Sequence, residues 1–399
     1  MAPTLWAGAF FFFVLSSNLV LRALRGQVGV SAGRDNLPLL FTGTFITALV
    51  ANALYWSLAN RLPRKRFVPL TYHFIAASLL VLYVLLSLVP EGGQDPIKFA
   101  FFIWYSVINL FTVCLFWVCM VDAFTDEQAK RLFGFIGVGG TAGGMTGSLI
   151  SANFVHLIGN EGLLILSLVL LEMAVFCSAK IARHSRERAA GVDQIASGGI
   201  LEGLKLAMAS PYLRSIGLYI FLMSSIGTLI YIKQVEIVGA AFSSEEDRTA
   251  YGGWVDFATQ TLTLLVELFL TARLIRLLGV GGTLLILPLF AFLGLLALGI
   301  SPTLQVLAVI QVLFATGRYS LAKPSREVLF TVVGKEEKYK SKSFTDTFVP
   351  RMADVGTVWA SIPIPTAFVS WVVLPLAVIW SSLGPRLGGM YRAVVRGRS

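Results

Sequence analysis

Residues 5–26 read LWAGAFFFFVLSSNLVLRALRG, an apolar run long enough to cross a bilayer that carries Arg22 and Arg25 near its end. In the second half of the chain, the apolar run 212–238 carries Lys233 and Glu236 at the same spacing. The second pair follows the first by 211 residues at both positions (233 − 22 and 236 − 25). Because a charge in hydrocarbon costs about 2.5–3.5 kcal/mol, charges inside spans usually face a polar interior. The pattern indicates a duplicated bundle with a polar path, which is typical of a transporter.

The composition is that of an integral membrane protein. Of the 399 residues, 56% are hydrophobic, 14% are charged and 29 are phenylalanine. A span needs about 20 mostly apolar residues. We therefore predict an all-α membrane bundle of twelve spans: 5–26, 37–60, 67–89, 98–122, 131–156, 161–183, 212–238, 250–272, 281–300, 303–323, 344–362 and 365–384. Little sequence is left over for a separate soluble domain.

The spans fall into two halves of six. We predict an N-terminal half over 1–183, a cytoplasmic linker over 184–211, a C-terminal half over 212–384 and a basic cytoplasmic tail over 385–399. Two six-helix halves related by a parallel repeat describe the major facilitator architecture, in which the halves rock about a central binding site.

The distribution of charge predicts the orientation. Most of the 32 basic residues fall in one set of alternate loops and in the tail, and positive loops are retained in the cytoplasm. We expect a monomeric, multi-pass protein of a bacterial inner membrane with both termini cytoplasmic. The same asymmetry explains the net charge of +10, so the lipid bilayer is an expected partner and nucleic acid is not.

Two longer motifs resemble a known family. Residues 122–140, DAFTDEQAKRLFGFIGVGG, are similar to the fourth-to-fifth helix signature of the ATP/ADP translocases of plastids and bacteria. Residues 323–330, KPSREVLF, with 338–346, KYKSKSFTD, resemble the family's segment after the tenth helix. In its first span the family has two tyrosines, Leu-Arg-Pro and Arg-Asp-Glu, where this chain has Asn18-Leu-Val-Leu-Arg22-Ala-Leu-Arg25-Gly-Gln27. The resemblance implies exchange of ATP for ADP, or transport of a related nucleotide, without hydrolysis.

A nucleotide carrier needs cations that converge on phosphates, preferably arginine for its bidentate geometry. Spans one, seven and ten would line the central cavity and supply the predicted substrate-binding residues: Arg22, Arg25, Lys233, Glu236, Arg318 and Lys323. A second group is expected to form gates or ion pairs: Asp122, Glu127, Lys130, Arg351 and Asp354. The alternative for these charges is interhelical ion pairing, and for Lys323 snorkelling toward the headgroups.

The glycine-rich run 137–142 matches the residue pattern of a dinucleotide-binding fingerprint but not its structural context. That fingerprint follows a strand, whereas this run follows a polar turn and begins an apolar helix. Gly139, Gly143 and Gly147 instead have the small-xxx-small spacing that allows close helix packing. The three cysteines and three histidines show no ligand spacing. We expect no metal, no cofactor and no enzyme activity.

Two other functions fit the same sequence. A transporter of another organic anion or of a lysophospholipid would work by exchange, or by proton coupling through an acid such as Glu236 or Asp256. A non-transporting membrane scaffold would move no substrate. An exchanger requires internal counter-substrate, a symporter responds to a pH gradient, and a scaffold does neither.

Overall fold

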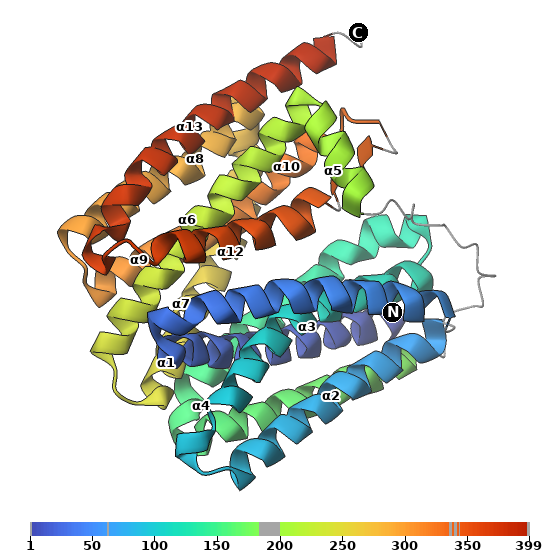
Figure 1. Ribbon diagram of the computed structural model, residues 1–399. Helices are drawn as coiled ribbons and strands as arrows, with labels where there is room; N and C mark the ends of the chain where they lie inside the picture. Colours follow the sequence, from blue (N-terminus) through green and yellow to red (C-terminus); the bar gives the residue numbers. More distant parts are fainter. Residues whose placement is uncertain are drawn as a thin grey trace. The chain divides into compact units, whose positions relative to one another are not determined.

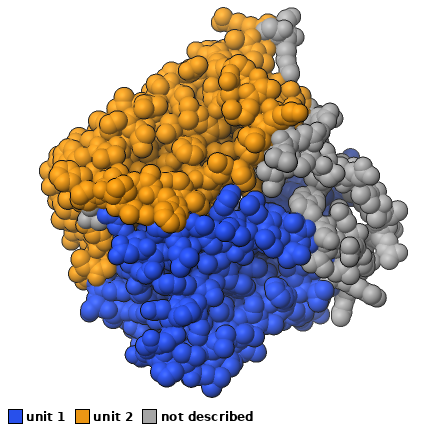
Figure 2. Space-filling view, in the orientation of Figure 1, with its two compact units in different colours: residues 1–191, 242–260 blue, residues 192–241, 261–399 orange. Residues whose placement is uncertain are grey.

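The computed structural model describes residues 2–61, 64–182, 200–334, 337–338, 341–342 and 344–396. Throughout these ranges the regular structure is helical, which confirms the expected all-α class. The chain divides into two compact units, coloured separately in Figure 2. Unit 1 comprises Met1–Gly191 and Phe242–Gln260, and unit 2 comprises Val192–Ala241 and Thr261–Ser399. The segment 242–260, which the sequence analysis placed in the second half, thus belongs to unit 1.

Unit 1 is built from four long helices and the first part of a fifth. These are α1 (Ala2–Arg61), α2 (Arg64–Leu88), α3 (Asp95–Ala123), α4 (Asp126–Ala182) and α7 (Glu245–Val266), with the 3₁₀ turn Glu91–Gly93 between α2 and α3. Helix α1 packs on α3 and α4, and α2 packs on α4 (Figure 1).

Aromatic side chains form the core between α1 and α3. The Phe11 ring stacks on Phe116 with centroids 4.0 Å apart, and Phe10 meets both Phe116 and Tyr72 edge to face. The Tyr72 hydroxyl donates to the Thr112 carbonyl at 2.7 Å, which satisfies its polar end. The apolar residues 10–13 of α1 thereby fix the helix that carries Arg22 and Arg25.

Glycines allow α1 and α4 to approach closely. A Cβ added at Gly139, Gly143 or Gly147 would meet the backbone of α1, at Gly8, Phe12 and Ser16 respectively. The Ser16 hydroxyl donates to the Gly143 carbonyl at 2.9 Å across this contact. The predicted packing role of this glycine spacing is confirmed.

Single glycines interrupt three of the long helices. Gly33 in α1, Gly159 in α4 and Gly279 in α8 have φ of 72°, 69° and 67°. An L-residue with a side chain rarely adopts this conformation, whereas glycine does so at little cost. Each of these glycines lies in a gap between two predicted spans, at 27–36, 157–160 and 273–280, and the chain kinks there between two stretches of helix.

Unit 2 is built from the remaining helices. These are α5 (Ile200–Ala209), α6 (Pro211–Ala241), the π-helix Glu267–Thr271, α8 (Ala272–Ile300), α9 (Leu304–Thr316), the π-helix Gly317–Ala322, α10 (Lys323–Phe330), the π-helix Phe344–Phe348, α12 (Val349–Ser361) and α13 (Thr366–Arg396). Helix α13 packs on α6 and α8, and α12 packs on α6. The buried Tyr219 and Trp380 lie at this contact, with ring centroids 5.3 Å apart.

Two predicted connecting segments contain helix. Residues 200–209 of the predicted linker form α5, and 184–199 lie outside the described residues. Of the predicted tail 385–399, residues 385–396 continue α13, and 397–399 are not described. Helix α13 contains two internal prolines, Pro375 and Pro385, and continues past both of them.

Among the described residues, eight helical segments are long and apolar enough to cross a membrane. Three of them, Pro3–Leu54, Arg131–Ile181 and Glu245–Ile300, have 52, 51 and 56 residues, more than twice the length of one span of about 20 residues. Each contains one of the three bent glycines. The predicted span 344–362 is absent from these eight, and it consists of the π-helix Phe344–Phe348 followed directly by α12. The count of twelve stays a prediction.

Candidate functional site

Arg22 forms an ion pair inside the membrane-spanning part of unit 1. Its Nη2 lies 3.3 Å from Oδ1 of Asp256, on the part of α7 that belongs to this unit. The Asp256 side chain is 9% exposed and the Arg22 side chain 37%. The carboxylate is therefore buried against a cation that stays partly exposed.

Arg25 lies one turn further along α1 and contacts α3. Its Nε donates to the Ser106 hydroxyl at 3.2 Å, and its guanidinium lies over the Phe102 ring, 3.9 Å from the centroid. The Phe41 ring is 5.8 Å away on the same helix as Arg25. Arginine suits this place because its planar group stacks on an aromatic face while its edge donates hydrogen bonds.

The matching pair in unit 2 is more enclosed. Lys233 Nζ lies 2.6 Å from Oε2 of Glu236, one turn along α6. The Lys233 side chain is only 4% exposed, whereas that of Glu236 is 38% exposed. Between them in the chain, Gln234 accepts a 2.7 Å hydrogen bond from Gln311 of α9. The two predicted pairs thus differ, because Arg22 pairs with α7 while Lys233 pairs within its own helix.

The other predicted substrate residues lie near the end of the tenth predicted span. Arg318 is partly buried in the π-helix Gly317–Ala322, and Lys323 is exposed at the start of α10. Lys323 lies close enough to Glu267 for the two charges to attract each other. Arg326, which the sequence analysis did not assign to the site, pairs with Asp346 at 3.3 Å.

The predicted gate residues lie in two places. Arg351 and Asp354 form an ion pair of 3.9 Å along α12, and the Thr228 hydroxyl of α6 donates to Asp354 at 2.8 Å. Asp122 and Glu127 are exposed at the end of α3 and the start of α4. The Lys130 side chain lies outside the described part of the structure. Their role as gates stays a prediction.

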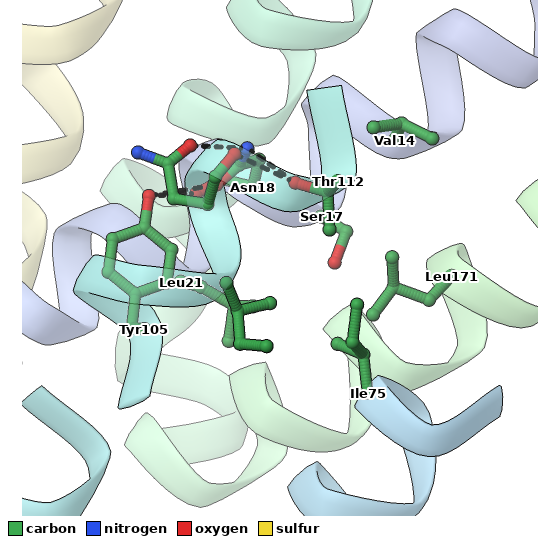
Figure 3. A pocket seen from close by; sticks show the side chains of 10 residues that line it. Val14, Ser17, Asn18, Leu21, Ile75, Tyr105, Thr112 and Leu171 are labelled. Carbon is green, nitrogen blue, oxygen red and sulfur yellow. Dashed lines mark hydrogen bonds between the residues drawn. The ribbon is translucent and has the colours of Figure 1, made fainter. Parts of the chain in front are cut away.

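A small pocket with a polar wall lies beside this part of α1, and sequence reasoning missed it. It is partly open to its surroundings and is lined from α1, α2, α3 and α4. In Figure 3, Asn18 and Tyr105 lie on one side of the pocket, and Val14, Ile75 and Leu171 on the other. A signal existed in the sequence, because Tyr105, Asn109 and Thr112 recur at helical spacing within the apolar span 98–122.

Comparison with known proteins supports the predicted resemblance. No family model matches the chain. The ADP,ATP carrier protein 2, chloroplastic, of Arabidopsis thaliana is 22% identical, over 97% of this chain and 74% of the relative. The resemblance to ATP/ADP translocases predicted from residues 122–140 and 323–330 is thereby confirmed as a distant one.

Solved structures identify the fold. The crystal structure of the nucleoside transporter NupG has a TM-score of 0.64 at 14% identity and covers 99% of each chain. That of a D-xylose–proton symporter has a TM-score of 0.65 at 12% identity and covers 96% of each chain. The chain is a multi-pass membrane protein with a transporter fold of the major facilitator type.

Proposed function

We propose that this protein is a secondary transporter that exchanges nucleotides of the ATP/ADP type by alternating access, without hydrolysis. The observation that carries the proposal is the pair Arg22 and Arg25 on α1, inside a membrane-spanning segment and held by polar and aromatic partners. The name of the chloroplastic relative, an ADP,ATP carrier, supports the nucleotide as substrate.

In this proposal the substrate's phosphates replace internal carboxylates. Arg22 carries a guanidinium with five N–H donors, and a phosphate accepts them in the same bidentate geometry as a carboxylate. Asp256 pairs with Arg22 at 3.3 Å, and Glu236 pairs with Lys233 at 2.6 Å. Removing the competing carboxylate should therefore strengthen anion binding, so Asp256→Asn raises the affinity for ADP.

The remaining assignments complete the proposal. Arg318 and Lys323 add substrate contacts, and the charged residues of the second group act as gates: Asp122, Glu127, Lys130, Arg351 and Asp354. The substrate is a small anion, and the protein works as a monomer in a bacterial inner membrane with both termini cytoplasmic.

The test is equilibrium binding of labelled ADP to the purified protein in lipid nanodiscs. A charge-assisted hydrogen bond contributes about 1.5–3 kcal/mol, so Arg22→Ala or Arg25→Ala should weaken ADP binding about 10- to 100-fold. Combining both with Lys233→Ala should abolish it. Arg276→Ala is the matched control, because Arg276 is exposed and bonds a carbonyl of its own helix. Intact binding by the triple variant would refute the site assignment.

A second candidate function is proton-coupled transport of another organic anion. The buried Asp256 favours it, because a carboxylate inside a span can carry a proton when its cation leaves. Uptake driven by an imposed pH gradient, without internal substrate, would support this candidate over exchange. Uptake that is independent of the pH gradient would exclude proton-coupled transport.

A further inference from the structure

A network of uncharged polar side chains joins α1 to α3 beside the two arginines. The buried Asn18 donates from Nδ2 to Oδ1 of Asn109 at 2.7 Å, and its own Oδ1 accepts from the Tyr105 hydroxyl at 2.9 Å. The single Tyr105 O–H is shared with the backbone carbonyl of Asn18, 3.0 Å from the hydroxyl oxygen. Asn18 is therefore held in one orientation and holds Asn109 in turn.

This network determines which atoms Asn109 presents. Its Oδ1 is engaged by Asn18, and among the described residues no hydrogen-bond partner is found for its Nδ2. The side chain is exposed. A polar group without a partner is costly in hydrocarbon, so such a side chain in a span faces a polar interior. Asn109 thus offers two N–H donors to a ligand that carries acceptors.

The amide of Asn109 and the two arginines lie at successive heights along the packed helices α1 and α3. Asn18, Arg22 and Arg25 are spaced i, i+4 and i+7, so they share one face of α1. At 1.5 Å of rise per residue, Arg22 lies about 6 Å and Arg25 about 10 Å along the axis from Asn18. On α3, Ser106, which Arg25 contacts at 3.2 Å, precedes Asn109 by one turn.

The separation between the arginines and Asn109 along the helix axis suits a ligand with two chemically different ends. An anionic end would meet the guanidinium groups, and an uncharged end with hydrogen-bond acceptors would meet Asn109 one to two helical turns away. A nucleotide has this form, because a ribose separates its phosphates from a ring that carries acceptor nitrogens or carbonyls. A lysophospholipid lacks such a ring.

We propose that Asn109 is a specificity-determining residue that donates hydrogen bonds to the nucleoside end of the substrate. Asn18 and Tyr105 are positioning residues that orient its amide. The inference rests on the proposed function, in which Arg22 and Arg25 bind the phosphates. Amide side chains read base edges by hydrogen bonds, and a site built to hydrogen-bond a substrate discriminates against molecules that lack the partner group.

A purely structural role for the network predicts something different. If it only ties α1 to α3, replacing Asn109 would affect stability and every ligand alike. If Asn109 reads the nucleoside, its loss would weaken only ligands that have one. The ratio of two affinities therefore separates the two roles.

The experiment measures binding of labelled ADP and of labelled pyrophosphate separately, on the full-length protein in nanodiscs. Pyrophosphate carries the two phosphoryl groups of ADP without the nucleoside. We expect Asn109→Ala to weaken ADP binding about tenfold and to leave pyrophosphate binding unchanged. Asn153→Ala is the matched control, because Asn153 is an exposed asparagine of α4 whose amide bonds the Leu149 carbonyl of its own helix. It should change neither affinity.

Equal losses for both ligands, or no loss for either, would overturn the inference. Tyr105→Phe removes only the hydroxyl that orients Asn18, so it should lower ADP affinity a few-fold and spare pyrophosphate. This variant decides the matter if Asn109→Ala does not fold. Wild-type protein that binds neither ligand would refute the proposed function and this inference together. Tight ADP binding that survives both substitutions would refute the inference alone.

Discussion

Breaking the Arg22–Asp256 pair from its two sides should have unequal effects on stability. Arg22→Met keeps the aliphatic stem but leaves the Asp256 carboxylate, 9% exposed, without this cation. Removing one partner of a buried pair costs about 3–5 kcal/mol. Asp256→Asn leaves the Arg22 guanidinium, 37% exposed, which we expect to face a polar, hydrated interior, and losing a pair of that exposure costs about 0–1 kcal/mol. Arg22→Met should therefore destabilise the protein by about 2 kcal/mol or more beyond Asp256→Asn.

The assay is a denaturant titration of the purified variants in detergent micelles, which gives the free energy of unfolding. The double variant Arg22→Met/Asp256→Asn should be about as stable as Asp256→Asn, because no charge is left buried without its partner. A double-mutant cycle then isolates the coupling between the two side chains. If Asp256→Asn lowers the free energy of unfolding as much as Arg22→Met does, burial of Asp256 does not cause the difference. A loss in the double variant equal to the sum of the two single losses would contradict it as well.

Three further predictions concern packing, backbone and orientation. Gly143→Ala should lower the free energy of unfolding by about 1–3 kcal/mol, because its Cβ would meet the α1 backbone, whereas Gly137→Ala, with nothing within 4 Å, should not. Gly159→Ala should cost about 1–2 kcal/mol through its positive φ, measured by the same titration, and an unchanged value would contradict the bend. Because the C-terminus is predicted to be cytoplasmic, a fluorescent protein fused after Ser399 should fluoresce and an alkaline phosphatase fused there should be inactive. The reverse result would show a periplasmic terminus.

The fold follows from composition and spacing, but the helix ends do not. Apolar runs of about 20 residues locate membrane helices whatever their packing. The stretch 27–36 was left outside the predicted spans 5–26 and 37–60. It is helical instead, since one glycine with φ of 72° is sufficient to bend the chain there. Sequence alone does not show which of several glycines adopts that conformation.

The candidate site follows from the sequence only in part. Arg22 and Arg25 stand out because charges are rare in apolar runs. The partner of Arg22 cannot be identified from the sequence, because Asp256 lies far along the chain and several other acidic residues occur in spans. Asn109 was missed for another reason. The free-energy cost of placing an uncharged amide in a membrane span is lower than that of a charge, so an asparagine in a span is a weaker sign of a site. Its link to Asn18 depends on how α1 packs on α3.

Nucleotide exchange is tested most directly by uptake of labelled ADP into proteoliposomes that contain the purified protein, with and without unlabelled ATP trapped inside. We predict that uptake requires the internal nucleotide and that Arg22→Ala strongly reduces it. Equal uptake by empty and loaded vesicles would contradict exchange. No uptake by folded protein, under either condition, would contradict nucleotide transport itself.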